Sequence, residues 1–166
     1  MCGIAGAYEY AGRRAIELPR VQAMLDAIAH RGPDDEGIHH DHGVAIGNGR
    51  LSIIDLAGGH QPIANEHGDV VVAFNGEIYN YKELRAALVA RGHTLRSDGD
   101  TEVIVHLYEE LGDDCLKELR GMFALAIWDA RGRRLLVARD RLGIKPLYYA
   151  DEDGRLVFGS EIKALL

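Results

Sequence analysis

The amino-acid sequence predicts a single α+β domain, and three observations support this fold class. The chain has 166 residues, of which 47% are hydrophobic, which is enough to bury one continuous core. Between residues 19 and 111, three segments carry apolar residues at helical spacing. From residue 122 onwards the apolar residues instead form short runs separated by turns, which predicts an antiparallel meander of strands.

The first predicted elements are a strand and a helix. Residues 2–8 are small and apolar and predict a central strand that begins at Cys2. An amphipathic helix is predicted over residues 19–30. Glycine and proline at 32–33 end this helix, and we expect residues 34–37 to continue as a loop.

The middle of the chain contains three apolar runs that predict strands, over residues 44–49, 53–56 and 70–74. The first two runs flank Arg50, which is therefore expected at a strand junction. The third run is rich in β-branched residues and predicts a buried strand. We expect the end of this strand to present the segment Asn75-Gly76-Glu77.

Two further helices follow. Asn80 and Glu83 have the spacing of a capping box and predict the start of a helix over residues 81–91. Asp100 is placed to cap a third helix, which ends before Gly112. A role for Asp100 in a binding site is the open alternative to this capping role.

The last part of the sequence predicts short strands joined by turns. The four predicted strands cover residues 122–129, 134–139, 147–150 and 155–159. The charged segment 139–143 between the second and third of them predicts an ion-paired loop. Residues 161–166 begin an apolar helix without a cap, which leads us to expect that the chain was cut from a longer protein.

The composition excludes several classes of protein. The chain has 19 basic and 26 acidic residues, and its net charge of −7 argues against a surface for nucleic acid or anionic membranes. The sequence has neither an apolar run long enough to span a membrane nor a signal peptide, so we expect a cytoplasmic protein with a small-molecule partner. A disulfide between Cys2 and Cys115 stays open, although the leucines around Cys115 favour burial of that thiol.

Cys2 is a candidate nucleophile because removal of Met1 would place its thiol and a free α-amine on one residue. An α-amine has a pKa of about 7.7 to 8.0 and can act as the base for its own thiol. Arg50, the segment 75–77 and Asp100 lie at strand or helix ends, where they can meet Cys2 in a pocket. Together they offer a thiolate, oxyanion donors, a guanidinium for a carboxylate and two acids for an ammonium, which suits a zwitterionic amino acid with a cleavable side chain.

The histidines predict no metal site. The cluster His39-His40-Asp41-His42 falls in a predicted polar loop and lacks cysteine partners. The remaining histidines are scattered singly through the sequence, at His30, His60, His67, His93 and His106.

Six motifs occur in a fixed order along the chain. They are Cys2-Gly3-Ile4, Arg31-Gly32-Pro33-Asp34, Arg50-Leu51-Ser52-Ile53, the run from Phe74 to Asn80, the run from Ser97 to Glu102, and the run from Arg139 to Leu147. In this order they resemble the glutaminase domain of a glutamine-hydrolysing asparagine synthetase, a class II glutamine amidotransferase. The resemblance covers essentially the whole chain, residues 1–166, as one glutamine amidotransferase domain.

The resemblance implies an N-terminal nucleophile hydrolase fold, a four-layer αββα sandwich in which two antiparallel sheets lie between helices. It implies that Cys2 attacks the side-chain amide of glutamine, that the Cys2 α-amine is the base, and that Asn75 and Gly76 form the oxyanion hole. The residues that it assigns to binding of the substrate are Arg50, Leu51, Ile54, Glu77 and Asp100, with Arg31 and Asp34 as supports of the pocket.

The resemblance also implies partners. It implies no cofactor in this domain, because ATP and Mg²⁺ would belong to a synthetase domain. Residues 57–60 lack the serine and the acid of that domain's S-G-G-x-D-S loop, so we expect this chain to lack the synthetase half. The implied partners are glutamine and a synthetase domain in cis or in trans, with no nucleic acid and no membrane, and a homodimer stays open.

Three alternatives to an asparagine synthetase glutaminase remain. The ammonia acceptor can be a different carboxylate, since acceptor choice resides in the other domain. Retention of Met1 would favour a non-catalytic glutamine-binding module. A hydrolase of another amide fits less well with the combined set of Arg50, Glu77 and Asp100.

Overall fold

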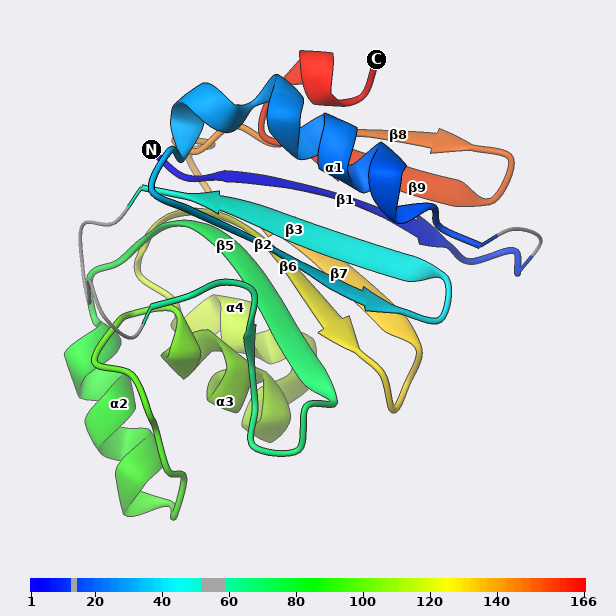
Figure 1. Ribbon diagram of the computed structural model, residues 1–166. Coiled ribbons are helices and arrows are strands. Elements are labelled where there is room, and N and C mark those ends of the chain that lie inside the picture. The colour runs from blue at the N-terminus through cyan, green and yellow to red at the C-terminus, as the bar shows by residue number, and fades with distance from the viewer. Residues whose placement is uncertain (13–14, 52–58) are drawn as a thin grey trace.

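The computed structural model describes residues 1–12, 15–51 and 59–166, apart from the side chain of residue 152. Two antiparallel β-sheets face each other, and helices cover the outer side of each sheet (Figure 1). This is the four-layer αββα sandwich that the resemblance implied.

The first sheet has five strands in the order β2-β3-β1-β9-β8. Its strands are β1 (Gly3–Glu9), β2 (Asp35–Asp41), β3 (Val44–Arg50), β8 (Tyr148–Glu152) and β9 (Arg155–Gly159). Strand β1 pairs with β3 on one side and β9 on the other, which confirms the predicted central strand. The second sheet has the order β4-β5-β6-β7. Its strands are β4 (Ile63–Ala64), β5 (Val70–Ile78), β6 (Gly121–Asp129) and β7 (Arg134–Arg139).

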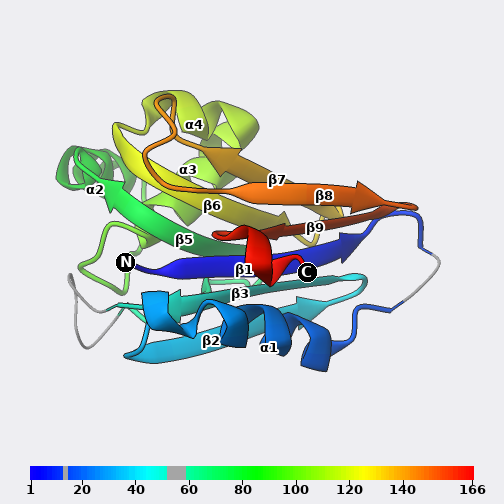
Figure 2. The ribbon, with the colours of Figure 1, turned by 90° about the horizontal axis from the view of Figure 1, so that it is seen from above.

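Helix α1 (Leu18–Ala27) and the short 3₁₀ helix η3 (Ile162–Ala164) cover the first sheet (Figure 2). The second sheet is covered by α2 (Tyr81–Ala90), α3 (Glu102–Leu111) and α4 (Cys115–Glu118) (Figure 1). Two further 3₁₀ turns, η1 (Ala29–Arg31) and η2 (Gly112–Asp114), follow α1 and α3. The three layer boundaries hold three apolar clusters, and the cluster between the sheets contains Ile4, Trp128 and Phe158, each at most 1% exposed.

The predicted loops at 34–37 and 39–42 are wrong, because residues 35–41 form strand β2. This strand lies at the edge of its sheet and is held by its backbone pairing with β3 from Asp35↔Arg50 to Asp41↔Val44. Within it, only Ile38 packs against the apolar core. The strand therefore carries too few apolar residues to show the alternation by which a strand is predicted.

The predicted meander of four consecutive strands is also wrong. Strands β6 and β7 pair in the second sheet, whereas β8 and β9 pair in the first. The chain crosses between the two sheets after β7. Both halves are hairpins with apolar faces, so local patterning identifies the strands without showing which sheet each hairpin joins.

Asn80 is the N-cap residue of α2 as predicted, but its side chain makes no capping hydrogen bond, and the predicted cap of α3 is wrong. The Asn80 side chain accepts from the Arg120 amide at 3.0 Å and donates to the Glu118 carbonyl at 3.0 Å, so it links α2 to the segment before β6. The N-cap of α3 is Thr101 rather than Asp100. The predicted ends of α2 and α3 are confirmed, and Gly92 and Gly112 follow them with φ of 101° and 57°.

The two cysteines are not joined in a disulfide. Cys115 is fully buried, as predicted, and burial raises the pKa of its thiol to about 12. In the described part of the chain, no helix is long and apolar enough to cross a membrane.

Candidate active site

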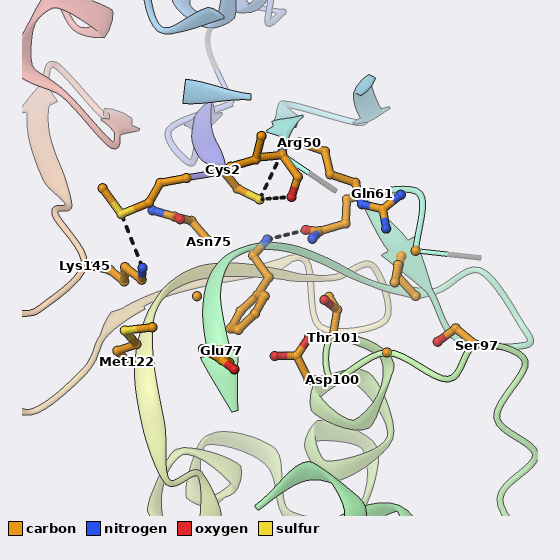
Figure 3. A pocket seen from close by; sticks show the side chains of 17 residues that line it. Cys2, Arg50, Gln61, Asn75, Glu77, Ser97, Asp100, Thr101, Met122 and Lys145 are labelled. Atoms are coloured by element: carbon orange, nitrogen blue, oxygen red, sulfur yellow. Dashed lines mark hydrogen bonds between the residues drawn. The ribbon is translucent and has the colours of Figure 1, made fainter. Parts of the chain in front are cut away.

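A cavity of about 110 Å³ opens where β1, β3 and β5 approach one another (Figure 3). Its lining includes the predicted residues Cys2, Arg50, Leu51, Asn75, Gly76, Glu77 and Asp100. Ile54 lies outside the described residues. The cavity is also lined by residues that the sequence did not single out for the site, among them Gln61, Ser97, Thr101, Met122 and Lys145.

Cys2 lies immediately before β1, where the pairing of Gly3 with Gly49 places it beside the end of β3. The Leu51 amide donates to the Cys2 sulfur at 3.4 Å, and the sulfur lies 3.7 Å from the Leu51 carbonyl oxygen. Arg31 donates from Nε to the Cys2 carbonyl at 3.1 Å. Leu51 therefore holds the Cys2 thiol at the cavity (Figure 3), and Arg31 holds the Cys2 backbone.

Arg31 is itself held by Glu161, whose Oε1 accepts from Arg31 Nη1 at 2.9 Å. The Arg31 hydrogen bond, with further bonds from Lys163 and His30, lowers the pKa of Glu161 to about 2. Glu161 thus fixes the guanidinium that fixes the backbone of Cys2. These contacts agree with the supporting role expected of Arg31.

The Glu161 pair should give the fold a measurable dependence on acid. The folded pKa of about 2 lies below the ordinary value of 4.5, so the pair stabilises the fold above about pH 4.5 and loses this contribution as the pH falls toward 2. At neutral pH we expect Glu161→Gln to lower the free energy of unfolding by about 1 to 2 kcal/mol, discounted for partial exposure. Denaturant unfolding at pH 7 and near pH 2 tests this, and an equal deficit at both pH values would contradict it.

Asn75 lies on β5 next to a residue whose backbone is held on both sides. The Phe74 amide donates to Gln61 Oε1 at 2.7 Å, and Asn48 Nδ2 donates to the Phe74 carbonyl at 2.9 Å. Asn75 is 1% exposed, and its Nδ2 has no hydrogen-bond partner among the described residues. A buried amide donor without a partner costs about 1–3 kcal/mol, so this N–H is available to an acceptor in the cavity that Asn75 and Cys2 both line (Figure 3).

Gly76 cannot carry a side chain at this point. A Cβ there would lie 2.3 Å from the Met122 carbonyl oxygen and 2.7 Å from the Phe123 Cα. The backbone of β5 therefore approaches β6 closely beside the cavity. The segment 75–77 lies in the last part of β5, because pairing with β6 continues beyond the predicted run 70–74 to Ile78↔Gly121.

Charged groups of opposite sign also line the cavity. Arg50, the last residue of β3, is 5% exposed. Asp100 is 7% exposed, and its Oδ2 accepts from the Ile78 amide at 2.8 Å. Burial raises the pKa of Asp100, and the charge of the neighbouring Glu77 raises it further. A guanidinium and two carboxylates around one small cavity suit the carboxylate and the ammonium of an α-amino acid.

Lys145 is a cavity residue that the sequence did not single out for the site. It is 7% exposed, and its Nζ lies 3.3 Å from the Met1 sulfur (Figure 3). Its position depends on Asp140, whose carboxylate accepts from four backbone amides at 3.0–3.1 Å, those of Phe123, Leu142, Ile144 and Lys145. Burial opposes the charge of Asp140, but these four bonds lower its pKa. The prediction of an ion-paired loop is therefore wrong, since Asp140 organises the loop through backbone amides.

The fold is shared with two solved structures of enzymes. A glutamine phosphoribosylpyrophosphate amidotransferase from B. subtilis has a TM-score of 0.79 and 21% identity, over 98% of this chain and 42% of that chain. A structure described as the allosteric regulatory enzyme of purine biosynthesis has a TM-score of 0.81 and 22% identity over the same shares. This likeness confirms the N-terminal nucleophile hydrolase type of fold.

The sequence profile of a family described as a glutamine amidotransferase domain matches residues 1–166, so the chain belongs to this family. It is 49% identical to asparagine synthetase [glutamine-hydrolyzing] 2 of Bacillus subtilis (strain 168), over 99% of this chain and 22% of that protein. It is 42% identical to asparagine synthetase [glutamine-hydrolyzing] 2 of Oryza sativa subsp. japonica, over 99% of this chain and 28% of that protein. The resemblance seen in the motifs is thereby confirmed, and the chain spans about a quarter of the length of these relatives.

Proposed function

We propose that the chain hydrolyses L-glutamine to L-glutamate and ammonia, with Cys2 as nucleophile. The observation that supports this most strongly is the unpartnered amide of Asn75, which lines the same cavity as Cys2, Arg50 and Asp100. Membership of the glutamine amidotransferase family supports the same reaction.

The proposed reaction begins with loss of Met1, which lines the cavity. Its removal converts the peptide nitrogen of Cys2 into a free α-amine. The freed amine takes the thiol proton, and the thiolate attacks the carbonyl carbon of the substrate side chain. Asn75 Nδ2 and the Gly76 N–H stabilise the oxyanion that forms. The carbon–nitrogen bond then breaks, the proton passes from the α-amine to the leaving nitrogen, and ammonia departs. Water attacks the resulting thioester, which yields glutamate and restores the thiol.

The remaining residues bind and orient glutamine in this proposal. Arg50 pairs with the α-carboxylate, and Glu77 and Asp100 take the α-ammonium. The backbone at Leu51, with that at Ile54, adds contacts to the substrate. Asp34 donates from its amide to the Arg50 carbonyl at 3.0 Å, which supports its role as a positioning residue for Arg50.

We propose that the ammonia passes to a synthetase domain of the asparagine synthetase type. The names of the relatives and the fraction of their length that this chain covers support this partner. Hydrolysis requires no cofactor in this scheme, whereas ATP and Mg²⁺ would serve the synthetase domain in the cytoplasm. Transfer of the ammonia to another carboxylate acceptor is the alternative, because the choice of acceptor would reside in the synthetase domain.

Release of ammonia and glutamate from glutamine tests the function. We expect equal amounts of both products from the chain that has lost Met1, and little turnover of asparagine, whose amide lies one methylene nearer to the anchored α-carbon. A processed chain that binds glutamine without releasing ammonia would support the non-catalytic alternative and contradict the proposal.

Asp100 should make glutamine binding depend on pH. Its ionised form is needed for the substrate ammonium, and its pKa is raised by burial and by Glu77. The KM for glutamine should therefore rise as the pH falls, starting at a higher pH than an ordinary aspartate would give, while kcat changes less. Asp100→Asn should have a high KM at every pH. A wild-type rise in KM that persists unchanged in this variant would assign the titration to another group.

A further inference from the structure

A second cluster of polar side chains lies on the outer side of the second sheet, and its members are not among the residues that line the cavity. Its members are His93 after α2, His106 and Glu109 on α3, and Glu66 in the turn between β4 and β5. His93 and His106 are scattered singly in the sequence, but the fold brings their Nδ1 atoms to 3.2 Å from each other. His106 is 1% exposed, so this contact lies at the inner end of the cluster.

Three potential ligand atoms converge in this cluster. His106 Nδ1 lies 2.9 Å from Glu109 Oε2, and His93 Nδ1 lies 4.0 Å from the same oxygen. The two nitrogens lie 3.2 Å apart. In a tetrahedral zinc site with bonds of 2.0–2.1 Å, two ligand atoms are expected about 3.3 Å apart, and the three observed separations lie on either side of this value. Glu66 Oε2, 3.9 Å from His106 Nδ1, is placed to supply a fourth ligand.

Hydrogen bonding alone does not satisfy these atoms when both imidazoles are neutral. His93 Nε2 lies 2.9 Å from Glu110 Oε1, so the proton of His93 belongs on Nε2 and its Nδ1 carries a lone pair. A proton on His106 Nδ1 would have to serve two acceptors and would leave the buried Nε2 without a partner. A proton on His106 Nε2 instead leaves two nitrogen lone pairs facing a carboxylate oxygen. A cation at the centre satisfies all three atoms.

The surrounding residues orient this cluster as outer partners of a metal site do. Glu110 fixes His93 through its Nε2, whereas Glu102 Oε1 lies behind His106 Nε2 at 3.8 Å, too far for a hydrogen bond. Asn65 is 4% exposed and donates from Nδ2 to Glu109 Oε1 at 2.7 Å, which leaves Glu109 Oε2 to face the histidines. Carboxylates behind ligating histidines and a held ligand carboxylate are the usual outer shell of zinc sites.

We propose that His93, His106 and Glu109 bind a divalent transition metal, zinc in the first instance, with Glu66 as the fourth ligand. Two imidazoles with carboxylates form a ligand set that suits zinc. The ion would tie the β4–β5 turn and the segment after α2 to α3. The site is separate from the reaction proposed for Cys2 and has a structural role.

Titration of the metal-free chain with Zn²⁺ alone tests this proposal. We expect saturable binding of one zinc ion per chain, and at 100 times Kd a rise in the midpoint of thermal unfolding of about 5–10 °C. Substitution with Co²⁺ should give the visible absorption of a tetrahedral site. None of these readouts needs glutamine, so they succeed or fail independently of the glutaminase activity.

Variants of the proposed ligands, compared with control variants elsewhere in the chain, test whether zinc binds at this cluster or at another histidine or cysteine. His93→Gln removes a ligand in a segment outside the helices, and Glu109→Gln keeps the shape of its side chain, so both variants should fold. Each should weaken zinc binding by more than the about 10- to 100-fold that loss of an outer partner causes. His42→Gln, on the turn of the other sheet, and Cys2→Ala should bind zinc as the wild type does. Absence of saturable binding, binding that survives both ligand variants, or binding lost in Cys2→Ala would overturn the proposal.

Discussion

Cys2→Ala abolishes glutamine hydrolysis, with an expected loss of turnover on the order of 10⁶-fold, as for removal of the nucleophile in other enzymes that act through a covalent intermediate. The cavity holds no second thiol, because Cys115, the other cysteine of the chain, is fully buried on α4. The pKa of Cys115 is raised to about 12, so its thiolate is scarcely formed at neutral pH. No other group can therefore replace Cys2 as the thiolate.

The measurement is ammonia release by the wild type, Cys2→Ala and the control variant Cys115→Ala. Cys115→Ala should hydrolyse glutamine at the wild-type rate. Calorimetric titration with glutamine should show that Cys2→Ala still binds the substrate, because Arg50, Glu77 and Asp100 remain in place. Residual turnover in Cys2→Ala within about tenfold of the wild type would exclude Cys2 as nucleophile, since covalent catalysis contributes far more than this.

Asn75→Ala should lower kcat by about 10²- to 10³-fold, the effect of removing one oxyanion-hole donor. The KM for glutamine should change much less, because the unpartnered Nδ2 meets a full negative charge only in the transition state. The fold should tolerate the change, since the backbone beside Asn75 is held by Gln61 and Asn48.

Asn75→Asp distinguishes an oxyanion donor from a packing role. The carboxylate has nearly the shape of the amide, so a packing role would be preserved. A negative charge beside the oxyanion should instead lower kcat at least as far as alanine does. Steady-state kinetics at neutral pH decides this, and a kcat in Asn75→Asp close to that of the wild type would remove Asn75 from the oxyanion hole.

Much of the site could be predicted because its residues belong to motifs with a shared order. Cys2, Arg50, Asn75 and Asp100 are far apart in the sequence, yet they line one cavity. Lys145 also belongs to one of these motifs, the run from Arg139 to Leu147, but its place in the cavity could not be predicted, since its burial depends on the bonds that Asp140 makes to backbone amides of its own loop and of β6. Such bonds leave no periodic signal in the sequence.

The lack of a periodic signal in the sequence also explains the errors in the predicted fold. The apolar runs of β1 and β5 predict strands, whereas the polar sequence of the edge strand β2 predicts a loop. The last four strands are divided between two sheets, and this division depends on tertiary packing rather than on local sequence. The cluster of His93, His106 and Glu109 likewise forms only when α3 packs beside the segment that follows α2.

The most direct test of the central claim is the mass spectrum of the chain, rapidly quenched with acid during turnover of glutamine. The account predicts a chain that has lost Met1, a fraction of which carries one additional glutamyl group located on the peptide that begins with Cys2. A chain without Met1 that releases ammonia but never carries this group, or carries it on another residue, would contradict a thioester at Cys2.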